Sequence, residues 1–239
     1  MWAVQKNERD RQAQKMREQT ARQYRHQAQL IRDAGGKKDP FTLYGAGPKP
    51  DPFTEKGAGS QSRFSNGEIY DWKEISAYVT DDFMNKLYEI GNEVGVNPEY
   101  LLVVINSESG INPTAINKSQ SGRILAAGLN QFTTHTFETI GVSSFEDILN
   151  QNAVQQLDLT KRLLLASKDK MRYARSAADI YWINMAPSLF VPYVDDDYVI
   201  CDAYGTASDI YRGNAGIDVN FGNGDGKLTK GELEAFLFR

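Results

Sequence analysis

Hydrophobic residues recur every three or four positions in several stretches after residue 64, which is the spacing of one helix face. The first repeat is formed by Phe83, Leu87, Ile90 and Val94. Thr80 stands before it as an N-cap, and Gly95 stands after it as a C-terminal stop. The pattern predicts a helix over 80–95.

The next predicted helix is apolar on all sides at its centre, because residues 101–105 are five consecutive apolar residues. Pro98 suits its first position, and Asn112 followed by Pro113 is expected to end it. We therefore expect this helix to lie inside the domain.

Two further helices are predicted, one running from Ser144 towards Leu165 and one over 174–185. Few stretches alternate between apolar and polar residues with a period of two, which excludes all-β and Rossmann folds. The fold class is therefore predicted to be mainly α.

Length, charge and cysteine content narrow the class of protein. The chain has 239 residues, enough for one or two domains, and a net charge of −4, which argues against a dedicated nucleic-acid binder. Residues 1–62 carry a net charge of +5 and the remainder −9. Cys201 is the one cysteine, so no intramolecular disulfide forms. No apolar run is long enough to cross a membrane, and the N-terminus lacks the apolar stretch of a signal peptide.

The basic part of the chain divides into two segments. Residues 1–33 are rich in Gln and Arg without Pro or Gly, and are interpreted as an arm that is either a solvated, disordered segment or a helix ordered by docking on another protein. Residues 34–62 are dense in Gly, Pro, Lys and Ser and are interpreted as a linker. The globular part is assigned to residues 63–215, and a separate tail to residues 216–239.

The candidate catalytic group is Glu108, which follows the apolar run 101–105 by one helical turn. Desolvation disfavours the charged form of a carboxyl group, raises its pKa, and suits it to act as a general acid near neutral pH. The alternative is a glutamate that faces solvent at a helix end.

The residues around Glu108 carry a family resemblance. Residues 108–115 read Glu-Ser-Gly-Ile-Asn-Pro-Thr-Ala, and residues 128–132 read Gly-Leu-Asn-Gln-Phe, followed by Thr136. In this order they resemble the paired motifs of the soluble lytic transglycosylase (SLT) domain, over roughly residues 80–190. The resemblance implies a lysozyme-like helical fold that cleaves peptidoglycan, with Glu108 as the catalytic acid/base.

The resemblance also implies a mechanism that needs a single carboxyl group, whereas ordinary glycosidases use two. Glu108 would protonate the oxygen between N-acetylmuramic acid and N-acetylglucosamine and then help to deprotonate the sugar's own 6-hydroxyl, which gives a 1,6-anhydro product. A water-using hydrolase of lysozyme type is the alternative. Ser109 and Gln131 are candidate substrate-binding donors, with local hydrogen bonds as the alternative role. Tyr181 is a candidate sugar-stacking residue, with a place in the core as the alternative.

Some positions depart from the family pattern. Asn130 stands where many members have Met, Thr134 stands where many have Pro, and the loop over 116–127 is longer than usual. These differences bear on substrate preference more than on the assignment of Glu108.

The tail resembles an EF-hand calcium loop followed by a helix. Its candidate Ca²⁺ ligands are Asp218, Asn220, Asn223, Asp225 and Glu232. The spacing is irregular, because counting back from Glu232 places Phe221 at the first ligand position. The alternative is a turn followed by a helix capping box, which residues 229–232 also fit. Calcium would be structural, and catalysis requires no cofactor.

The combination of an SLT-like domain with a calcium-like tail resembles phage internal or ejected virion proteins. This implies location in the virion, with action in the host periplasm and cell wall during genome entry. The expected partners are peptidoglycan glycan strands and, through the N-terminal arm, other virion proteins; no specific nucleic acid and no transmembrane segment are expected. The alternative is a structural virion protein whose lysozyme-like domain is inactive.

Overall fold

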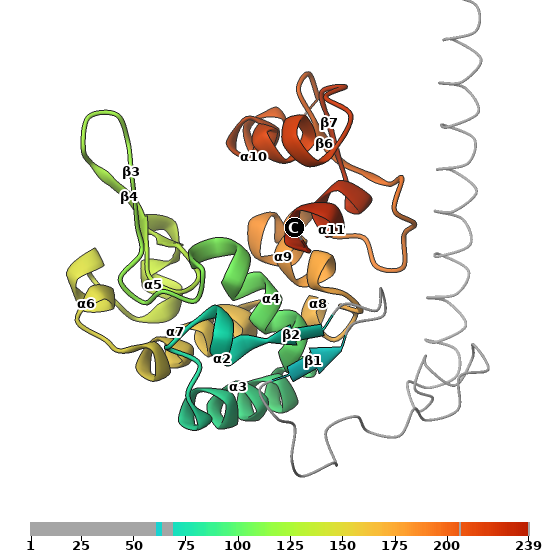
Figure 1. The fold of residues 1–239 in the computed structure, drawn as a ribbon. Coiled ribbons are helices and arrows are strands. Elements are labelled where there is room, and N and C mark those ends of the chain that lie inside the picture. The colour runs from blue at the N-terminus through green and yellow to red at the C-terminus, as the bar shows by residue number, and fades with distance from the viewer. Residues whose placement is uncertain (1–60, 64–68, 206, 239) are drawn as a thin grey trace, which may run out of the picture. The chain divides into compact units, whose positions relative to one another are not determined.

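The computed structural model describes residues 61–63, 69–205 and 207–238. The described residues all belong to one compact unit, residues 58–239 (Figure 1). The predicted arm and nearly all of the predicted linker lie outside the described residues.

The predicted helix over 80–95 is confirmed as α3, Asp81–Val94. The side chain of Thr80 accepts a hydrogen bond from the N–H of Phe83, and Gly95 adopts the left-handed conformation with φ 85°. A short antiparallel pair, β1 (Gln61–Arg63) and β2 (Ile69–Asp71), and the helix α2 (Trp72–Ile75) come before it.

The buried central helix is α4, Pro98–Ser109, and its residues 101–105 are buried as predicted. The predicted end at Asn112 was wrong by one turn. Gly110 takes the left-handed conformation, with φ 63°, and its N–H bonds to the carbonyl of Asn106, which closes the helix earlier.

The helix predicted from Ser144 towards Leu165 is in fact two helices, α6 (Phe145–Leu149) and α7 (Ala153–Ala166). The break has a local cause, because Asn152 forms a new capping box with Gln155. A short helix α5 (Phe137–Ile140) and a 3₁₀ turn η2 (Thr134–Thr136) precede this pair. After α7 come α8 (Lys168–Met171), α9 (Ala177–Met185) and a 3₁₀ turn η3 (Pro187–Leu189), and α9 lies within the predicted span 174–185.

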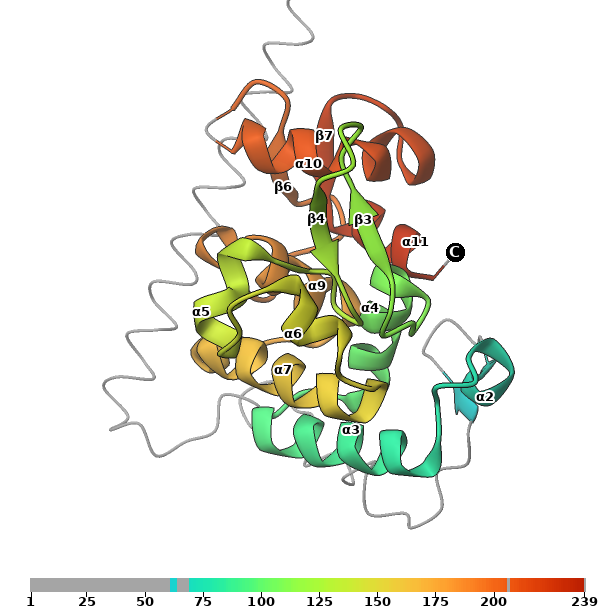
Figure 2. The same ribbon diagram turned by 90° about the vertical axis from the view of Figure 1, so that its left-hand side faces the viewer.

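The expected long loop over 116–127 contains a β-hairpin. Its strands β3 (Ile116–Lys118) and β4 (Ile124–Ala127) pair antiparallel, and β4 also pairs with β5 (Phe132–Thr133). The hairpin projects from the helices in both views (Figures 1 and 2). Strands of two to four residues are too short for a period-two pattern to stand out in the sequence.

The C-terminal part consists of β6 (Val199–Asp202), α10 (Ser208–Phe221), β7 (Lys227–Thr229) and α11 (Lys230–Leu237). Strands β6 and β7 pair antiparallel. Helix α10 runs without a break across residues 215 and 216, the predicted boundary between the globular part and the tail. Helix α11 contacts both α4 and α9.

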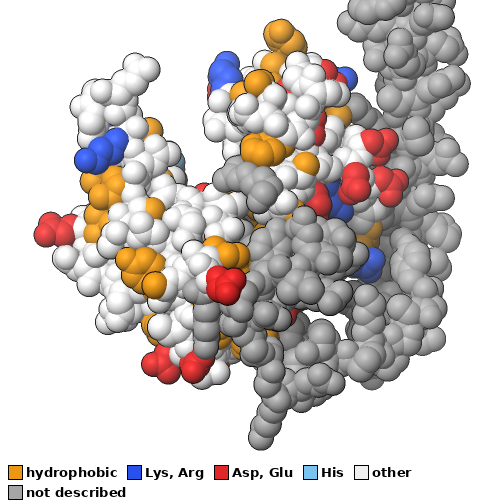
Figure 3. All heavy atoms as spheres, in the orientation of Figure 1, with side chains coloured by type: hydrophobic (Ala, Val, Ile, Leu, Met, Phe, Trp, Pro, Cys, Tyr) orange, Lys and Arg blue, Asp and Glu red, His pale blue; other side chains and the backbone are white. Residues whose placement is uncertain are grey.

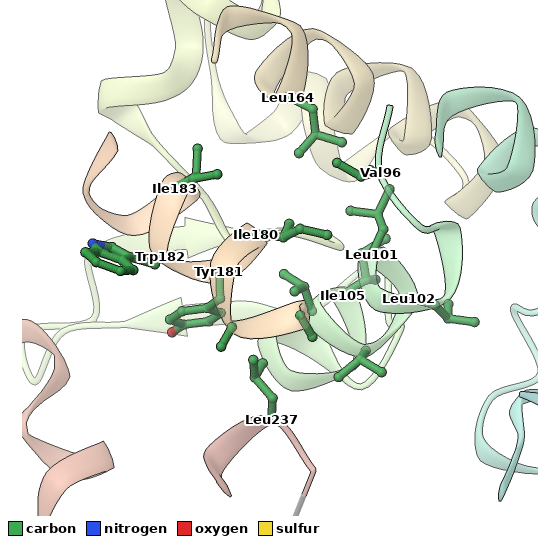
Figure 4. Packing of buried hydrophobic residues seen from close by; sticks show 14 of the residues in the cluster. Val96, Leu101, Leu102, Ile105, Leu164, Ile180, Tyr181, Trp182, Ile183 and Leu237 are labelled. Atoms are coloured by element: carbon green, nitrogen blue, oxygen red, sulfur yellow. The ribbon is translucent and has the colours of Figure 1, made fainter. Parts of the chain in front are cut away.

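The main core surrounds α4, and Figure 4 shows it at close range. Side chains from α4, α7, α9 and α11 meet there, and among them are Leu101, Leu102, Ile105, Leu164, Ile180, Trp182, Ile183 and Leu237. The elements of the C-terminal part therefore belong to the same core as the helix that carries Glu108. Among the described residues, no helix has the length and apolar character needed to cross a membrane.

Candidate active site

Glu108 lies in the last turn of α4, three positions after the last of the buried residues 101–105. The residue keeps partial exposure, while burial of its carboxyl group raises the pKa from an ordinary value of 4.5 to about 7. A pKa near neutrality makes both protonation states accessible, so the group is able both to donate and to accept a proton.

The turn after Glu108, residues 108–115, is held by hydrogen bonds within the turn and to residues outside it; we call it the Glu108 turn. The hydroxyl of Ser109 donates to the carbonyl of Ile105 at 3.2 Å and accepts from the N–H of Asn112 at 3.2 Å. The carbonyl of Ile111 accepts from the hydroxyl of Ser76 at 3.4 Å. The structure thus shows the local role that was the alternative for Ser109.

Residues 128–132, which we call the Gly128 turn, lie against the Glu108 turn. The N–H of Gly128 donates to the carbonyl of Ala115 at 2.9 Å. The side-chain amide of Gln131 lies 3.0 Å from the carbonyl of Gly128 and 3.4 Å from that of Ala115. The two motifs are therefore in contact, and the amide nitrogen of Gln131 helps to join them.

Backbone strain is present in both turns. Ile111 has φ 56° and Gln131 has φ 45°; together with Tyr193 they are the non-glycine residues with positive φ in the described part of the chain. Such conformations cost about 1–3 kcal/mol each and concentrate at functional sites, where the surrounding structure enforces them. The strain marks these two turns as a candidate site independently of their sequence.

A hollow lies between two projecting parts of the described surface. Figure 3 shows open space between the projecting β3–β4 hairpin and the lobe that contains β6, α10 and β7. In the ribbon view of the same orientation, the C-terminal end of α4 lies beneath this space (Figure 1). The hairpin and the C-terminal lobe are thus the two walls of a groove.

Tyr181 lies in the core on α9. It is 9% exposed, and its ring packs edge-on against Phe236 of α11 with centroids 5.6 Å apart. The structure therefore places it in the position that was the alternative to sugar stacking.

The candidate calcium ligands are not all brought together. Asp218 is fully buried at the end of α10, and its Oδ2 accepts from the Tyr211 hydroxyl at 2.7 Å and from the Gly226 N–H at 2.9 Å. Its Oδ1 is buried and accepts no hydrogen bond. Although burial raises the pKa of Asp218, the bonds from Tyr211 and Gly226 hold that pKa below its ordinary value.

The remaining candidate ligands have partners inside the loop, with one exception. Asn223 Oδ1 accepts from the N–H of Asp225, Asp225 Oδ1 accepts from that of Lys227, and Glu232 completes a capping box with Thr229. Asn220 is exposed and its amide bonds back to Gly216 of its own helix. Across the described residues, no group of three or more His, Cys, Asp or Glu side chains is arranged to hold a metal ion.

Sequence reasoning did not single out two buried polar residues of α7, Gln156 and Thr160. Both contact the Gly128 turn, through Leu129 and Asn130 respectively. The sequence signal for these two residues is their spacing. They are polar, four positions apart and so on one face of the helix, next to the apolar Leu157 and Leu164. That signal is weak, because a polar pair at this spacing is also typical of a solvated helix face.

A family comparison agrees with the geometry. Residues 87–156 match the model of the Transglycosylase SLT domain. The match includes the Glu108 turn, the β3–β4 hairpin and the Gly128 turn, and it ends at Gln156. Comparison with curated proteins and with solved structures found no match. The mainly helical fold is the one expected for a lysozyme-like SLT domain.

Proposed function

We propose that this chain, which carries an SLT-type transglycosylase segment, is a peptidoglycan lytic transglycosylase with Glu108 as its acid and base. One observation carries the proposal: the carboxyl group whose pKa burial raises to about 7 lies in one of two touching turns that the family model matches. A residue that acts first as an acid and then as a base must be able to hold and to release its proton at neutral pH.

The reaction proceeds in two proton transfers. Protonated Glu108 gives its proton to the glycosidic oxygen as the bond from C1 of N-acetylmuramic acid breaks. The resulting carboxylate then accepts the proton of the sugar's 6-hydroxyl, whose oxygen bonds to C1 and closes the 1,6-anhydro ring. No water is consumed, and an internal nucleophile avoids the entropic cost of bringing in a second reactant.

Two carboxyl groups downstream of Glu108 in the sequence are consistent with a mechanism that uses one acid. Glu138 is exposed. Asp147 is engaged by the backbone N–H groups of Ser143 and Ser144, which lower its pKa and assign it to capping α6. Glu138 is exposed and Asp147 is engaged in capping α6, so neither is placed as the second carboxyl group that a hydrolase needs, which favours the transglycosylase over the two-carboxylate hydrolase.

Purified murein sacculi test the activity. The wild-type chain should release soluble muropeptides whose mass is one water lower than that of the corresponding reducing products. Reducing ends of full mass would instead identify a hydrolase. Failure to release any product would favour the alternative of a structural protein with an inactive lysozyme-like domain.

We further propose that the protein is carried in a phage virion and opens the host cell wall locally during genome entry. The support is the resemblance of the SLT segment and calcium-like tail to such proteins, together with a basic segment, residues 1–62, that suits docking on acidic virion components. Detection of the chain in purified particles by mass spectrometry, at a constant ratio to the capsid protein, is the test.

We also propose that the loop between α10 and α11 binds Ca²⁺ in a structural role. The support is the ligand-like spacing of the loop and the buried Oδ1 of Asp218, an oxygen that lacks a donor and would suit a cation. Because no three acidic groups are gathered there, binding requires Asp225 and Glu232 to move closer to Asp218. The ion would clamp α11 against the core.

A further inference from the structure

Gln156 occupies an unusual place in the fold, because it is a fully buried amide outside both family motifs. Its Oε1 accepts from the N–H of Leu129 at 2.9 Å. Its Nε2 lies 2.8 Å from the carbonyl of Pro113, 3.0 Å from that of Ile148 and 3.2 Å from that of Gln151. A buried amide whose nitrogen and oxygen are both hydrogen-bonded holds its neighbours in a defined geometry.

Two of these partners belong to the candidate active site. Leu129 is in the Gly128 turn, and Pro113 is in the Glu108 turn. Gln156 therefore bonds to both turns from a third element, the helix α7. The hydrogen bonds from Gly128 and Gln131 to Ala115, in contrast, join the two turns directly.

The fit around Gly128 shows that this contact is tight. Gly128 has φ 81°, and a Cβ placed there would lie 2.5 Å from Gln156 Oε1 and 2.8 Å from Ile148 Cγ2. Only a glycine allows the amide of Gln156 to approach the Leu129 N–H so closely. The buried amide of Gln156 therefore depends on the absence of a side chain at Gly128.

Thr160 extends the contact by one helical turn. Its hydroxyl lies 2.5 Å from Asn130 Oδ1, and both residues are buried. Thr160 and Gln156 therefore fix two successive residues of the Gly128 turn, Leu129 and Asn130, to the rigid helix α7.

We propose that Gln156, supported by Thr160, is a positioning residue that sets the distance between Glu108 and the sugar-binding face of the Gly128 turn. The proposal rests on the proposed transglycosylase function. Gln156 acts through Leu129 and Pro113 and does not itself touch the substrate. A displacement of about 1 Å between reacting groups is enough to slow an enzyme about 100-fold.

The test compares Gln156→Leu, Thr160→Val and the control Gln155→Leu. Gln155 is the exposed neighbour on the same helix, and its side chain caps α7 at Asn152 without contacting either turn. Each variant is assayed on sacculi well below its own melting temperature, so that activity is expressed per folded molecule. Gln156→Leu should lose about 10- to 100-fold in kcat/KM and Thr160→Val less, whereas Gln155→Leu should lose stability alone.

Two further readouts separate positioning from a general loss of structure. The pH midpoint of activity should stay unchanged in Gln156→Leu, because burial of Glu108 sets it. Gln156→Glu keeps an acceptor for the Leu129 N–H, and its carboxyl group can donate to the Pro113 carbonyl only when it is protonated. The activity of this variant relative to wild type should therefore recover as the pH is lowered.

Amide hydrogen exchange provides a readout that does not need activity. In Gln156→Leu, exchange should rise in residues 128–131 and remain as in wild type in α4. Wild-type activity per folded molecule in both Gln156→Leu and Thr160→Val would overturn the positioning proposal and leave the transglycosylase intact. An inactive wild type would instead overturn the proposed function. In that case, hydrogen exchange in residues 128–131 that is the same in Gln156→Leu as in wild type would also overturn the positioning of the turn.

Discussion

The Oε1 atom of Gln156 lies 2.5 Å from the point where a Cβ on residue 128 would stand, so the amide fills the space that a side chain at Gly128 would need. This contact joins a motif glycine to a residue 28 positions later in the chain. It explains in steric terms why the Gly128 turn has no room for another amino acid.

The first prediction uses a glycine pair with equal backbone geometry. Gly122, at the exposed end of the β-hairpin, has the same φ of 81° as Gly128 but no atom within 4 Å of an added Cβ. Gly122→Ala should therefore cost only backbone strain, about 1 kcal/mol, whereas Gly128→Ala should cost a further 1–3 kcal/mol or so from overpacking. Urea unfolding of both variants measures the difference, and equal losses would contradict the steric account.

The second prediction concerns the catalytic proton. Glu108→Gln should lower the rate of sacculus degradation by at least about 100-fold, because general acid–base catalysis contributes about that much or more. Glu138→Gln, a change of the same kind at an exposed carboxyl group, is the control and should keep wild-type activity. Dye release from labelled sacculi measures both. An active Glu108→Gln variant would remove this residue from the mechanism.

The third prediction links Glu108 to stability. The folded protein holds the Glu108 proton with a pKa of about 7, against 4.5 ordinarily, so the wild type loses stability as the pH rises through this range. Glu108→Gln carries no charge and avoids that loss. It should be about 1–3 kcal/mol more stable than wild type at pH 8, with the difference vanishing towards pH 4. Thermal melts across the pH range check this, and parallel curves would show that the group is fully hydrated.

The fourth prediction tests the calcium proposal. Ca²⁺ at 100 times its dissociation constant should stabilise the protein by about 2.7 kcal/mol, which corresponds to a rise of about 5–10 °C in Tm that EGTA reverses. Asp225→Asn keeps the turn but removes a ligand charge, and should lose most of the shift. Asn220→Ala should keep it, because Asn220 bonds to its own helix. A wild-type Tm that is the same with and without Ca²⁺ would contradict the calcium proposal and identify the loop as a capped turn.

The helices around the site were predictable because their signals are local. The N-cap of Thr80, the proline at position 98 and the apolar run 101–105 define α3 and α4 within a few neighbouring residues. The raised pKa of Glu108 was predictable from the same run, since a carboxyl group one turn beyond a buried segment is expected to lose part of its hydration.

The parts that were missed depend on contacts between distant residues or on local signals too weak to read. The role of Gln156 is visible only when α7 is placed against Leu129 and Pro113. The β3–β4 hairpin has strands too short for a periodic signal, and the position of Tyr181 in the core depends on α11. The end of α4 at Gly110 was a local feature whose left-handed geometry outweighed the later proline.

The packing of α11 against α4 and α9 has a practical consequence for anyone who wishes to shorten this protein. A recombinant fragment limited to residues 87–156 would retain Glu108 but expose the apolar sides of its helix that Ile180, Ile183 and Leu237 otherwise cover. Such a fragment is expected to aggregate on expression, and the smallest soluble version should extend to the last turn of α11.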